Sequence, residues 1–442
     1  MTHPTTQTLT IEGTGFGGEG YVQIEPGRFI SVPHTLKGDV VEARVGPLHR
    51  GRAWGVVEVW RQRSAGHVDP GCAHYDRCSG CALRHISLVD ELAWKRDAVR
   101  QILERYGPAS CRDLPIDDVC AGRRAGHRAR GRFRVSEVDG EVRVGLQSLE
   151  LDRSLIDIRR CPAQAPAFIA LMGEIAELLG GHPEAARGVE AVELWTQGDE
   201  ALAILSCGPG VRGELAPALR ALAEARGMAL GFVEGDEVEM LRGEAVLPVI
   251  HEVALGGASV RVEPPVGSWV HATPEAAGAL LGWVTGRLQG RGHRAALDVC
   301  CGTGTLTFHL SGLVERVVAI DEDHRAVEAI VEAARRAGIE GIEGRAGRAG
   351  AVLRKLRQRP GVGPRPTLAT VNPMRRPLGG DQLRDLPALG VEQILYLGPA
   401  PASAARDAVI LDAMGFAPIR AAAVNLHPAT AQVMLAIDWV RR

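Results

Sequence analysis

The stretch from Ala295 to Asp321 constrains the fold of this chain more than any other. It reads as an apolar strand at Ala295–Val299, a tight turn containing Gly302 and Gly304, an apolar helix, and a second strand that ends in Asp321. Glycine permits the sharp turn and the close approach of a ligand, and a helix starting there directs free N–H groups at that ligand. An acid at the tip of the second strand suits the two hydroxyls of a ribose. The sequence therefore predicts an α/β nucleotide-binding unit.

The spacing of this turn selects among the known nucleotide-binding patterns. D-x-x-x-G-x-G, which begins at Asp298, differs from the dinucleotide pattern G-x-G-x-x-G and from a phosphate loop. It resembles motif I of class I methyltransferases, whose ligand is S-adenosylmethionine. A helix expected at Asp323–Gly338 and further apolar strands at Thr367–Val371 and Gln393–Leu397 continue the alternation, which predicts a doubly wound, mainly parallel sheet. We expect a Rossmann-like methyltransferase domain over residues 266–442.

Length and composition restrict the protein class. A chain of 442 residues is too long for one core, so two or three domains are expected. Arg supplies nearly all of the basic charge, since the only lysines are Lys37, Lys95 and Lys355. Arginine suits phosphate binding. A proteome rich in Ala, Gly and Arg would explain the high arginine content equally well. No apolar run is long enough to span a bilayer and no signal peptide is visible, so we expect a soluble, cytoplasmic monomer without a membrane partner.

The N-terminal region, residues 1–62, has the pattern of a small β-barrel. From Thr8 to Trp60 there are five short, half-alternating apolar stretches with glycine-rich turns between them, which is typical of the OB type. The letters G-x-G-G-E-G-Y-V and F-I-S-V-P-x-T-L-x-G-D also resemble the TRAM domain, an OB-like RNA-binding module. A small barrel without a ligand is the alternative interpretation.

A cysteine group follows the barrel. Cys72, Cys78 and Cys81 lie close together, and Cys161 is a fourth candidate. Three cysteines at this spacing in a chain without a secretion signal indicate a thiolate metal site rather than disulfides. Zinc sites usually have two C-x-x-C pairs and this segment has one, whereas the spacing resembles the 4Fe–4S site of an RNA methyltransferase family. Four buried thiols without a metal are the alternative, and the remaining Cys111, Cys120 and Cys207 are interpreted as plain thiols.

An arginine-rich strand is expected within a central α/β domain at residues 63–265, whose helix at Leu88–Tyr106 is expected to pack on the methyltransferase domain. In the segment G-R-R-A-G-H-R-A-R-G-R-F-R-V, four arginines alternate with other residues and share one face of an extended strand. A phosphate-bearing partner would relieve their mutual repulsion. A solvated surface strand is the alternative. The predicted RNA-binding residues are Arg128, Arg130, Arg132 and Phe133, with Arg134 on the same face as the arginines.

Together these features resemble the bacterial uracil-C5 RNA methyltransferases, which modify ribosomal or transfer RNA. The resemblance covers nearly the whole chain. It implies a 4Fe–4S cluster on the four cysteines and a flipped or unstacked uridine as substrate. It also implies a cysteine thiolate that attacks C6 of uracil, methyl transfer from S-adenosylmethionine to C5, and a carboxylate that removes the C5 proton.

The chain departs from this family at the reacting groups. In the segment that normally reads Y-x-S-C-N-P, Pro399 stands in place of the nucleophile, and no cysteine follows Cys301. Met434 stands in place of the glutamate base. The expected D-P-P-R reads N-P-M-R from Asn372, and the glutamine that usually contacts the cofactor aligns with His271. The cofactor-binding residues implied by the resemblance are Asp298, Gly302, Gly304, Asp321, His271 and Asn372.

Three functions remain open from the sequence. The first is an RNA-binding family member, a pseudoenzyme or assembly factor, without uracil-C5 methylation, since neither nucleophile nor base is useful alone. The second is an RNA methyltransferase that acts on a different atom, such as an exocyclic nitrogen, because Asn372-Pro373 is similar to the loop of amino methyltransferases. The third is an iron–sulfur redox or interaction module, which the arginine strand and the TRAM-like domain disfavour.

Overall fold

The computed structural model describes residues 4–256, 258–359 and 363–442, and its internal contacts divide the chain into two units. Unit 1 contains residues 4–91, 122–244 and 427–431. Unit 2 contains Leu92–Ala121, Ala245–Leu426 and Gln432–Arg442. The expected boundaries at residues 62 and 265 do not appear in this division, and the three-domain organisation stays a prediction. Among the described residues no helix is both long and apolar enough to cross a bilayer.

The first sheet of unit 1 has six strands in the order β1-β5-β6-β4-β3-β2. Strands β1 and β2 follow one another along the chain but stand at opposite ends of this order, so the sheet closes on itself. The sequence predicted five strands; a sixth arises because the chain changes partner, from β5 to β3, at Ile11–Glu12. The strands are β1 (Thr5–Thr10), β2 (Gly13–Thr14), β3 (Gly20–Glu25), β4 (Arg28–Val32), β5 (Val40–Val45) and β6 (Arg52–Gln62).

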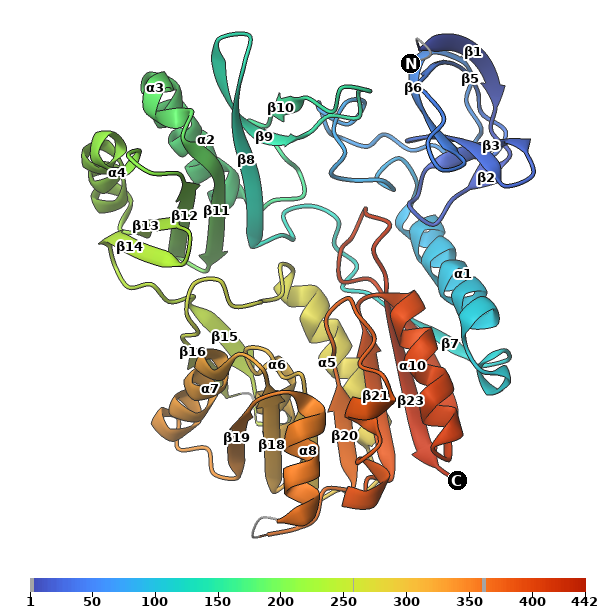
Figure 1. Cartoon of the computed structure of the whole chain (residues 1–442), viewed down its shortest axis with the longest axis vertical. Helices are drawn as coiled ribbons and strands as arrows, with labels where there is room; N and C mark the ends of the chain where they lie inside the picture. The colour runs from blue at the N-terminus through green and yellow to red at the C-terminus, as the bar shows by residue number, and fades with distance from the viewer. Residues whose placement is uncertain (1–3, 257, 360–362) are drawn as a thin grey trace. The chain divides into compact units, whose positions relative to one another are not determined.

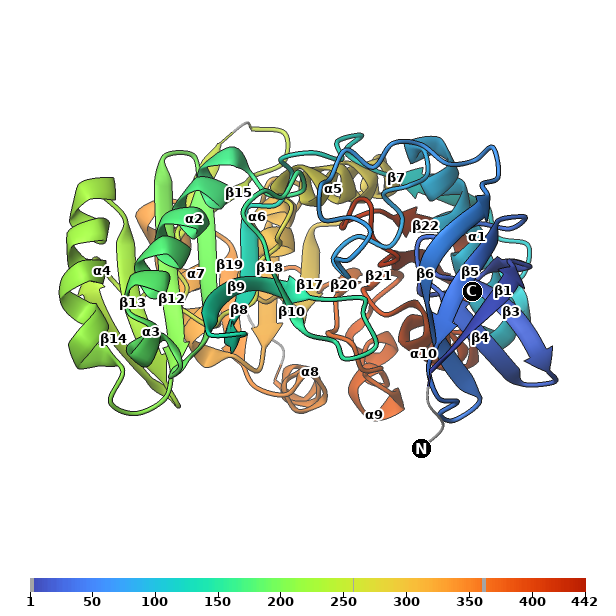
Figure 2. The ribbon, with the colours of Figure 1, turned by 90° about the horizontal axis from the view of Figure 1, so that it is seen from above.

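The second sheet of unit 1 has seven strands in the order β10-β9-β8-β11-β12-β13-β14. Helices α2, α3 and α4 lie along it (Figure 2), and apolar residues of α2 and α4 share one core with Phe133 and Val135 of β8. The elements are β8 (Arg130–Val138), β9 (Glu141–Gln147), β10 (Leu155–Asp157), α2 (Pro166–Gly181), α3 (Pro183–Ala186), β11 (Val189–Gln197), β12 (Glu200–Cys207), α4 (Arg212–Arg226), β13 (Ala229–Glu234) and β14 (Glu237–Arg242). Strand β14 ends just before Gly243, whose φ of 76° turns the chain.

Unit 2 is built on an eight-stranded sheet in the order β19-β18-β17-β20-β21-β23-β22-β7. All neighbouring pairs are parallel except those that involve β23. The order reverses at β17, with β18 on one side and β20 on the other, so this is a doubly wound sheet whose switch point lies at the end of β17. The strands are β7 (Ile116–Val119), β17 (Ala295–Val299), β18 (Arg316–Asp321), β19 (Ile342–Ala346), β20 (Leu368–Val371), β21 (Gln393–Gly398), β22 (Phe416–Val424) and β23 (Met434–Arg441).

Helices cover this sheet, and a separate hairpin, β15 (Val249–Glu252) with β16 (Ser259–Val262), completes unit 2 (Figure 1). Helix α1 spans Leu88–Tyr106 as the sequence predicts, and its Val99 and Leu103 belong to the same apolar core as β17, β18 and β21. The other helices are α5 (Pro274–Leu288), α6 (Thr305–Ser311), α7 (His324–Arg336), α8 (Ala349–Gln358), α9 (Gly380–Leu383) and α10 (Pro401–Ala413); two short 3-10 turns lie at Ala109–Cys111 and Pro387–Leu389. The predicted mixed α/β architecture is confirmed.

Candidate active site

The glycine turn after β17 has the conformation that its sequence demands. Gly302 and Gly304 have φ values of 55° and 92°, in the region that favours glycine. The Asp321 carboxylate accepts hydrogen bonds from the backbone N–H of Gly302 at 2.9 Å and of Asp323 at 3.0 Å. A Cβ at Gly304 would press on Ile330, whereas a Cβ on Gly302 would meet only open space. Gly304 is therefore required for packing, and Gly302 leaves the backbone accessible to a ligand.

Asp298 lies in β17, just before this turn, and its side chain makes contacts within the core. Its side chain is fully buried and accepts hydrogen bonds from the hydroxyls of Thr307 at 2.6 Å and Thr370 at 2.8 Å. Burial raises the pKa of this carboxyl to about 6, although the two hydroxyl donors oppose the shift. Asp298 thus ties β17 to α6 and β20 from inside the core, and the cofactor contact predicted for it stays untested.

His271 and Asn372 lie in two loops of unit 2. Asn372 follows β20 directly, and its backbone N–H donates to the carbonyl of Val299 at 3.0 Å. The half-buried ring of His271 lies against Trp269, with centroids 4.5 Å apart and planes at 73°. Because ligands of doubly wound sheets bind outside the carboxyl ends of the strands, the position of Asn372 and the Gly302 turn agrees with the predicted cofactor site.

The positions expected for nucleophile and base hold Pro399 and Met434. Pro399 follows the last residue of β21, at the carboxyl edge of the sheet, and α10 begins two residues later. Met434 is the first residue of β23 and is buried. Asp407 of α10, also buried, accepts hydrogen bonds from the Tyr396 hydroxyl at 2.5 Å and from the backbone N–H of Leu378 at 2.7 Å. Asp407 therefore links β21, α10 and the loop after β20 close to Pro399 in the chain.

The two cysteines next to the glycine turn are poor substitutes for a nucleophile. Burial raises the pKa of the Cys300 thiol to about 12, and it raises the pKa of Cys301 well above its usual value. The charges of Asp298 and Asp321 act in the same direction. Since the thiolate is the reactive form of cysteine, both side chains are unreactive thiols at neutral pH.

The four candidate metal ligands lie in one region of unit 1. Burial raises the pKa of Cys78 to about 11 and of Cys81 to about 12, and each is raised further by the nearby charges of Cys72 and Cys161. Among the described residues, however, no three or more His, Cys, Asp or Glu side chains are arranged closely enough to hold a metal ion. The thiols gather as the sequence predicts, but they do not form a closed ligand set in this structure.

The arginine strand β8 alternates as predicted, but its charges are partly neutralised within the protein. Arg130 lies over the ring of Trp195 at 5.0 Å, and both Arg130 and Arg132 pair with Glu193 of β11, at 3.7 and 3.3 Å. Arg134 is exposed on the same face. Arg128 precedes β8 and forms an isolated bridge to Gln164. The repulsion inferred from the sequence is therefore smaller than expected.

Phe133 lies on the other face of β8 from the arginines. It is 1% exposed, and its ring lies 5.7 Å from that of Phe168. Because side chains alternate along a strand, the register that exposes the arginines places Phe133 in the core. In this structure Phe133 supports the strand and offers no surface to RNA.

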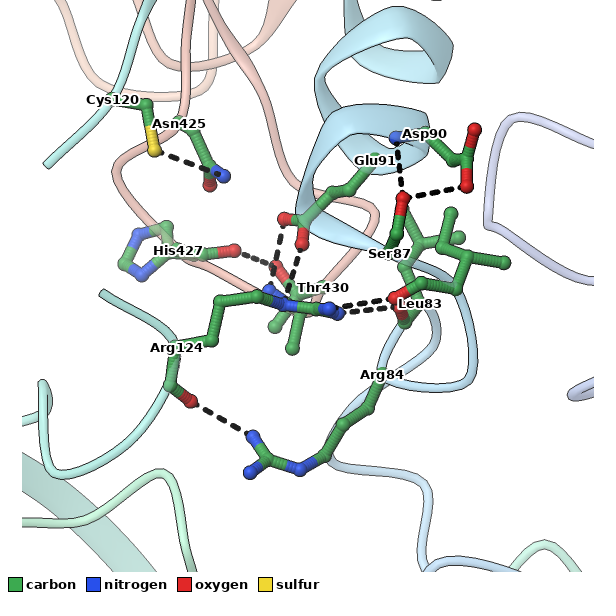
Figure 3. A network of polar contacts seen from close by, with 12 residues as sticks. Leu83, Arg84, Ser87, Asp90, Glu91, Cys120, Arg124, Asn425, His427 and Thr430 are labelled. Carbon is green, nitrogen blue, oxygen red and sulfur yellow. Dashed lines mark hydrogen bonds and ion pairs between the residues drawn. The ribbon is translucent and has the colours of Figure 1, made fainter. Parts of the chain in front are cut away.

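The segment His427–Ala431, between β22 and β23, belongs to unit 1 and is fixed there by a polar network (Figure 3). The backbone N–H of Ala429 donates to the fully buried Glu91 carboxylate at 2.9 Å, and its carbonyl accepts from Leu83 at 2.9 Å. Arg124 pairs with Glu91 at 3.1 Å and donates to the Leu83 carbonyl at 2.7 Å. The C-terminal part of the chain is thereby attached to the residues that follow the cysteine segment.

Comparisons with known proteins support this geometry. No family model matches the sequence. The 23S rRNA (uracil(1939)-C(5))-methyltransferases RlmD of Chromohalobacter salexigens and Halomonas elongata are each 28% identical to this chain, over 97% of its length and 88% and 89% of theirs. An uncharacterized RNA methyltransferase of Gloeobacter violaceus is 26% identical over 97% of this chain and 95% of its own length. Over nearly its whole length, this chain is therefore similar to uracil-C5 RNA methyltransferases.

A solved structure shares the fold of this chain. It is the tRNA (uracil-54, C5)-methyltransferase of Pyrococcus abyssi in complex with S-adenosyl-L-homocysteine, with a TM-score of 0.73, 18% identity, and coverage of 98% of this chain and 99% of that one. This chain thus shares the mixed α/β fold of that solved structure. Sequence reasoning missed how Asp407 anchors the loop after β20, although the A-R-D segment that contains it was already visible.

Proposed function

We propose that this chain binds RNA but does not methylate uracil at C5 by the covalent route of the family. The observation that carries the proposal is Pro399 at the end of β21, the position that the resemblance assigns to the nucleophile. Met434 at the position of the base supports it independently. The neighbouring thiols Cys300 and Cys301 are protonated at neutral pH, so they do not replace the missing group.

The chemistry explains why both losses matter. Uracil is a poor nucleophile at C5 until a thiolate adds at C6, and proline has no group that can add there. After methyl transfer, a base must remove the C5 proton before the thiolate leaves, and a thioether does not accept that proton at neutral pH. A chain without either group has no first step and no last step on this route.

The proposal includes two cofactors that the resemblance implies. S-adenosylmethionine would lie at the glycine turn, where Gly302 leaves its backbone open and Asp321 ends β18, and the relatives' naming as methyltransferases supports this. Cys72, Cys78, Cys81 and Cys161 would hold a 4Fe–4S cluster, because four gathered thiols in a chain of this family are the donor set for one. In this structure the thiols would have to move closer together to do so.

RNA binding would use the arginines of β8 together with the closed six-stranded sheet, here interpreted as a TRAM-like module. Gel-shift titration of the full chain against ribosomal RNA and tRNA fragments at several salt concentrations tests this part. We expect the logarithm of the association constant to fall linearly with the logarithm of the salt concentration. Absence of any salt-dependent binding would contradict it.

A second candidate function is methyl transfer to a different atom, and the open turn at Gly302 next to Asn372 favours it. Calorimetric titration with S-adenosylmethionine, followed by incubation with RNA and radiolabelled cofactor, separates the two functions. Tight binding with label transferred to RNA would establish the second function. Binding without transfer fits an RNA-binding protein that has kept its cofactor.

A further inference from the structure

Unit 1 contains a pocket of 170 Å³ beside the glycine-rich turn that joins β2 to β3. It is bounded by that turn, by the cysteine segment and by the connection between β9 and β10. A cavity of about 150 Å³ is large enough to hold a benzene molecule, so this pocket has room for a planar ring. The lining residues that matter for its chemistry are Glu19, His34, Trp54, Ser79 and Arg153.

The turn is shaped to hold a carboxylate inside this pocket. The Glu19 side chain is only 7% exposed, and its Oε1 accepts from the guanidinium of Arg52 at 3.0 Å. A Cβ at Gly15 or at Gly17 would press directly on the Glu19 carboxylate oxygens. The sequence G-F-G-G-E therefore requires glycine at these positions, because the carboxylate lies against the backbone of the turn. The ion pair of Glu19 with Arg52 is made through Oε1.

One aromatic and one basic side chain, Trp54 and Arg153, also line the pocket. The indole of Trp54 is fixed by a hydrogen bond from its Nε1 to the Leu149 carbonyl at 3.1 Å. The backbone of Arg153 has a φ of 53°, and its side chain is exposed at the rim. Phe16, at the tip of the same turn, is 52% exposed. An acceptor in a confined space, with an exposed ring and a guanidinium nearby, matches the parts of a nucleotide.

We propose that this pocket binds a nucleobase that presents N–H donors on one edge, guanine above all, either within RNA or in a free nucleotide. An ionised carboxylate only accepts hydrogen bonds, and guanine offers two adjacent N–H groups on its Watson–Crick edge, whereas adenine offers one donor beside an acceptor. Arg153 would bind the attached phosphate, and Phe16 would stack on a neighbouring base. The proposal for a base within RNA rests on the proposed function, whereas the proposal for a free nucleotide does not.

The wild-type full chain tests the proposal without any substitution. Calorimetric titration with 5′-GMP, 5′-IMP and 5′-AMP measures the free-nucleotide source, and single-stranded oligonucleotides with one guanine, hypoxanthine or adenine measure the RNA source. Either GMP or the guanine oligonucleotide is expected to bind about tenfold more tightly than its adenine counterpart. One bidentate contact to a base discriminates by about this factor. Hypoxanthine, which lacks the 2-amino donor, should be intermediate. Equal affinity for all three bases in both sources would overturn the proposal.

Two matched variants test the role of the carboxylate. Glu19→Gln replaces one acceptor oxygen by a donor and should abolish the preference for guanine. Glu150→Gln, at a carboxylate that lines the same pocket but pairs with Arg44 at 2.6 Å, should retain it. A guanine preference that survives in Glu19→Gln would overturn the assignment to Glu19.

The outcomes separate this proposal from the proposed function. RNA binding that is indifferent to guanine and to Glu19→Gln, together with no GMP preference, rejects the pocket and leaves RNA binding intact. A Glu19-dependent preference for GMP in a chain that does not bind RNA rejects RNA binding and keeps the pocket. A chain that binds neither RNA nor any of the three nucleotides rejects both proposals.

Discussion

The hydroxyl of Tyr396 donates to the carboxylate of Asp407 over 2.5 Å, and both side chains are buried. These residues flank Pro399, one on β21 and one on α10. The pair holds the strand and the helix together on either side of Pro399. The proposal that Pro399 stands in place of a nucleophile therefore concerns a position with buried, hydrogen-bonded surroundings.

The first prediction concerns this pair. Tyr396→Phe removes one hydrogen bond to a charged acceptor, while Asp407 keeps the N–H groups of Leu378 and Gly379. The free energy of unfolding should fall by about 1.5–3 kcal/mol, measured by urea denaturation. The matched control is Tyr106→Phe, because the Tyr106 side chain is only partly buried and its ring lies beside the guanidinium groups of Arg105 and Arg406. This variant should change stability by less than about 0.5 kcal/mol. Equal effects of both variants would contradict the inferred role of the pair.

The second prediction follows from the raised pKa of Asp298. With a pKa of about 6 in the folded chain and 3.8 in the unfolded chain, the folded state binds the proton more tightly. The contribution of this group to stability is therefore full below pH 3.8 and is lost as the pH rises to about 6. Asn cannot titrate, so from pH 4 to pH 7 the stability of Asp298→Asn relative to wild type should rise by about 2.5 kcal/mol.

Chemical denaturation at several pH values measures this difference. Asp139→Asn, at a side chain that is 86% exposed, is the control, and its difference from wild type should stay within about 0.5 kcal/mol. A difference between Asp298→Asn and wild type that does not change with pH would show that burial does not perturb Asp298.

The third prediction concerns the arginine strand. Arg134→Gln should lower RNA affinity and reduce the slope of log affinity against log salt by about 0.7, the value for one phosphate contact with a single strand. Glu193→Gln should instead raise affinity, because it releases Arg130 and Arg132 from their internal pairs. Arg294→Gln, at an exposed pair with Glu315 in unit 2, provides the control. Unchanged binding in all three variants would place the RNA elsewhere.

The fourth prediction concerns the cysteine group. Anaerobic purification should give a brown protein with about four irons per chain. Cys161→Ser should lose iron, whereas Cys120→Ser, outside the group, should retain it. A colourless protein that contains zinc, or iron that persists in Cys161→Ser, would overturn the cluster assignment.

Local sequence patterns predicted local structure well. The helix Leu88–Tyr106, the strand Ala295–Val299 and the glycine turn after it were predicted at their observed positions. In these segments the structure is determined by apolar periodicity and glycine positions within a few residues of chain. Such local patterns can be read directly from a sequence. Phe133, which was predicted to bind RNA, is buried because the alternation that exposes the arginines of β8 points the Phe133 side chain into the core.

Contacts between distant segments could not be predicted in this way. Strand β7 pairs with β22 through Ile116 and Ala421, and buried Lys95 donates to Asn425 at 2.7 Å. Glu193 neutralises two arginines from a strand about 60 residues earlier, a distance along the chain at which no periodicity acts. The carboxylate of Glu19 was also missed, although its glycine-rich turn was noticed, because burial of an acid depends on residues far away in the sequence.

The most direct test of the account is made on the purified chain with ribosomal RNA or tRNA from cells that lack the gene. After incubation with S-adenosylmethionine, nucleoside mass spectrometry measures 5-methyluridine, and 5-fluorouridine RNA reports any covalent adduct on denaturing gels. We expect RNA binding with neither 5-methyluridine nor an adduct. Formation of 5-methyluridine by the purified chain would contradict the account, since it would require a nucleophile other than the one that Pro399 has replaced.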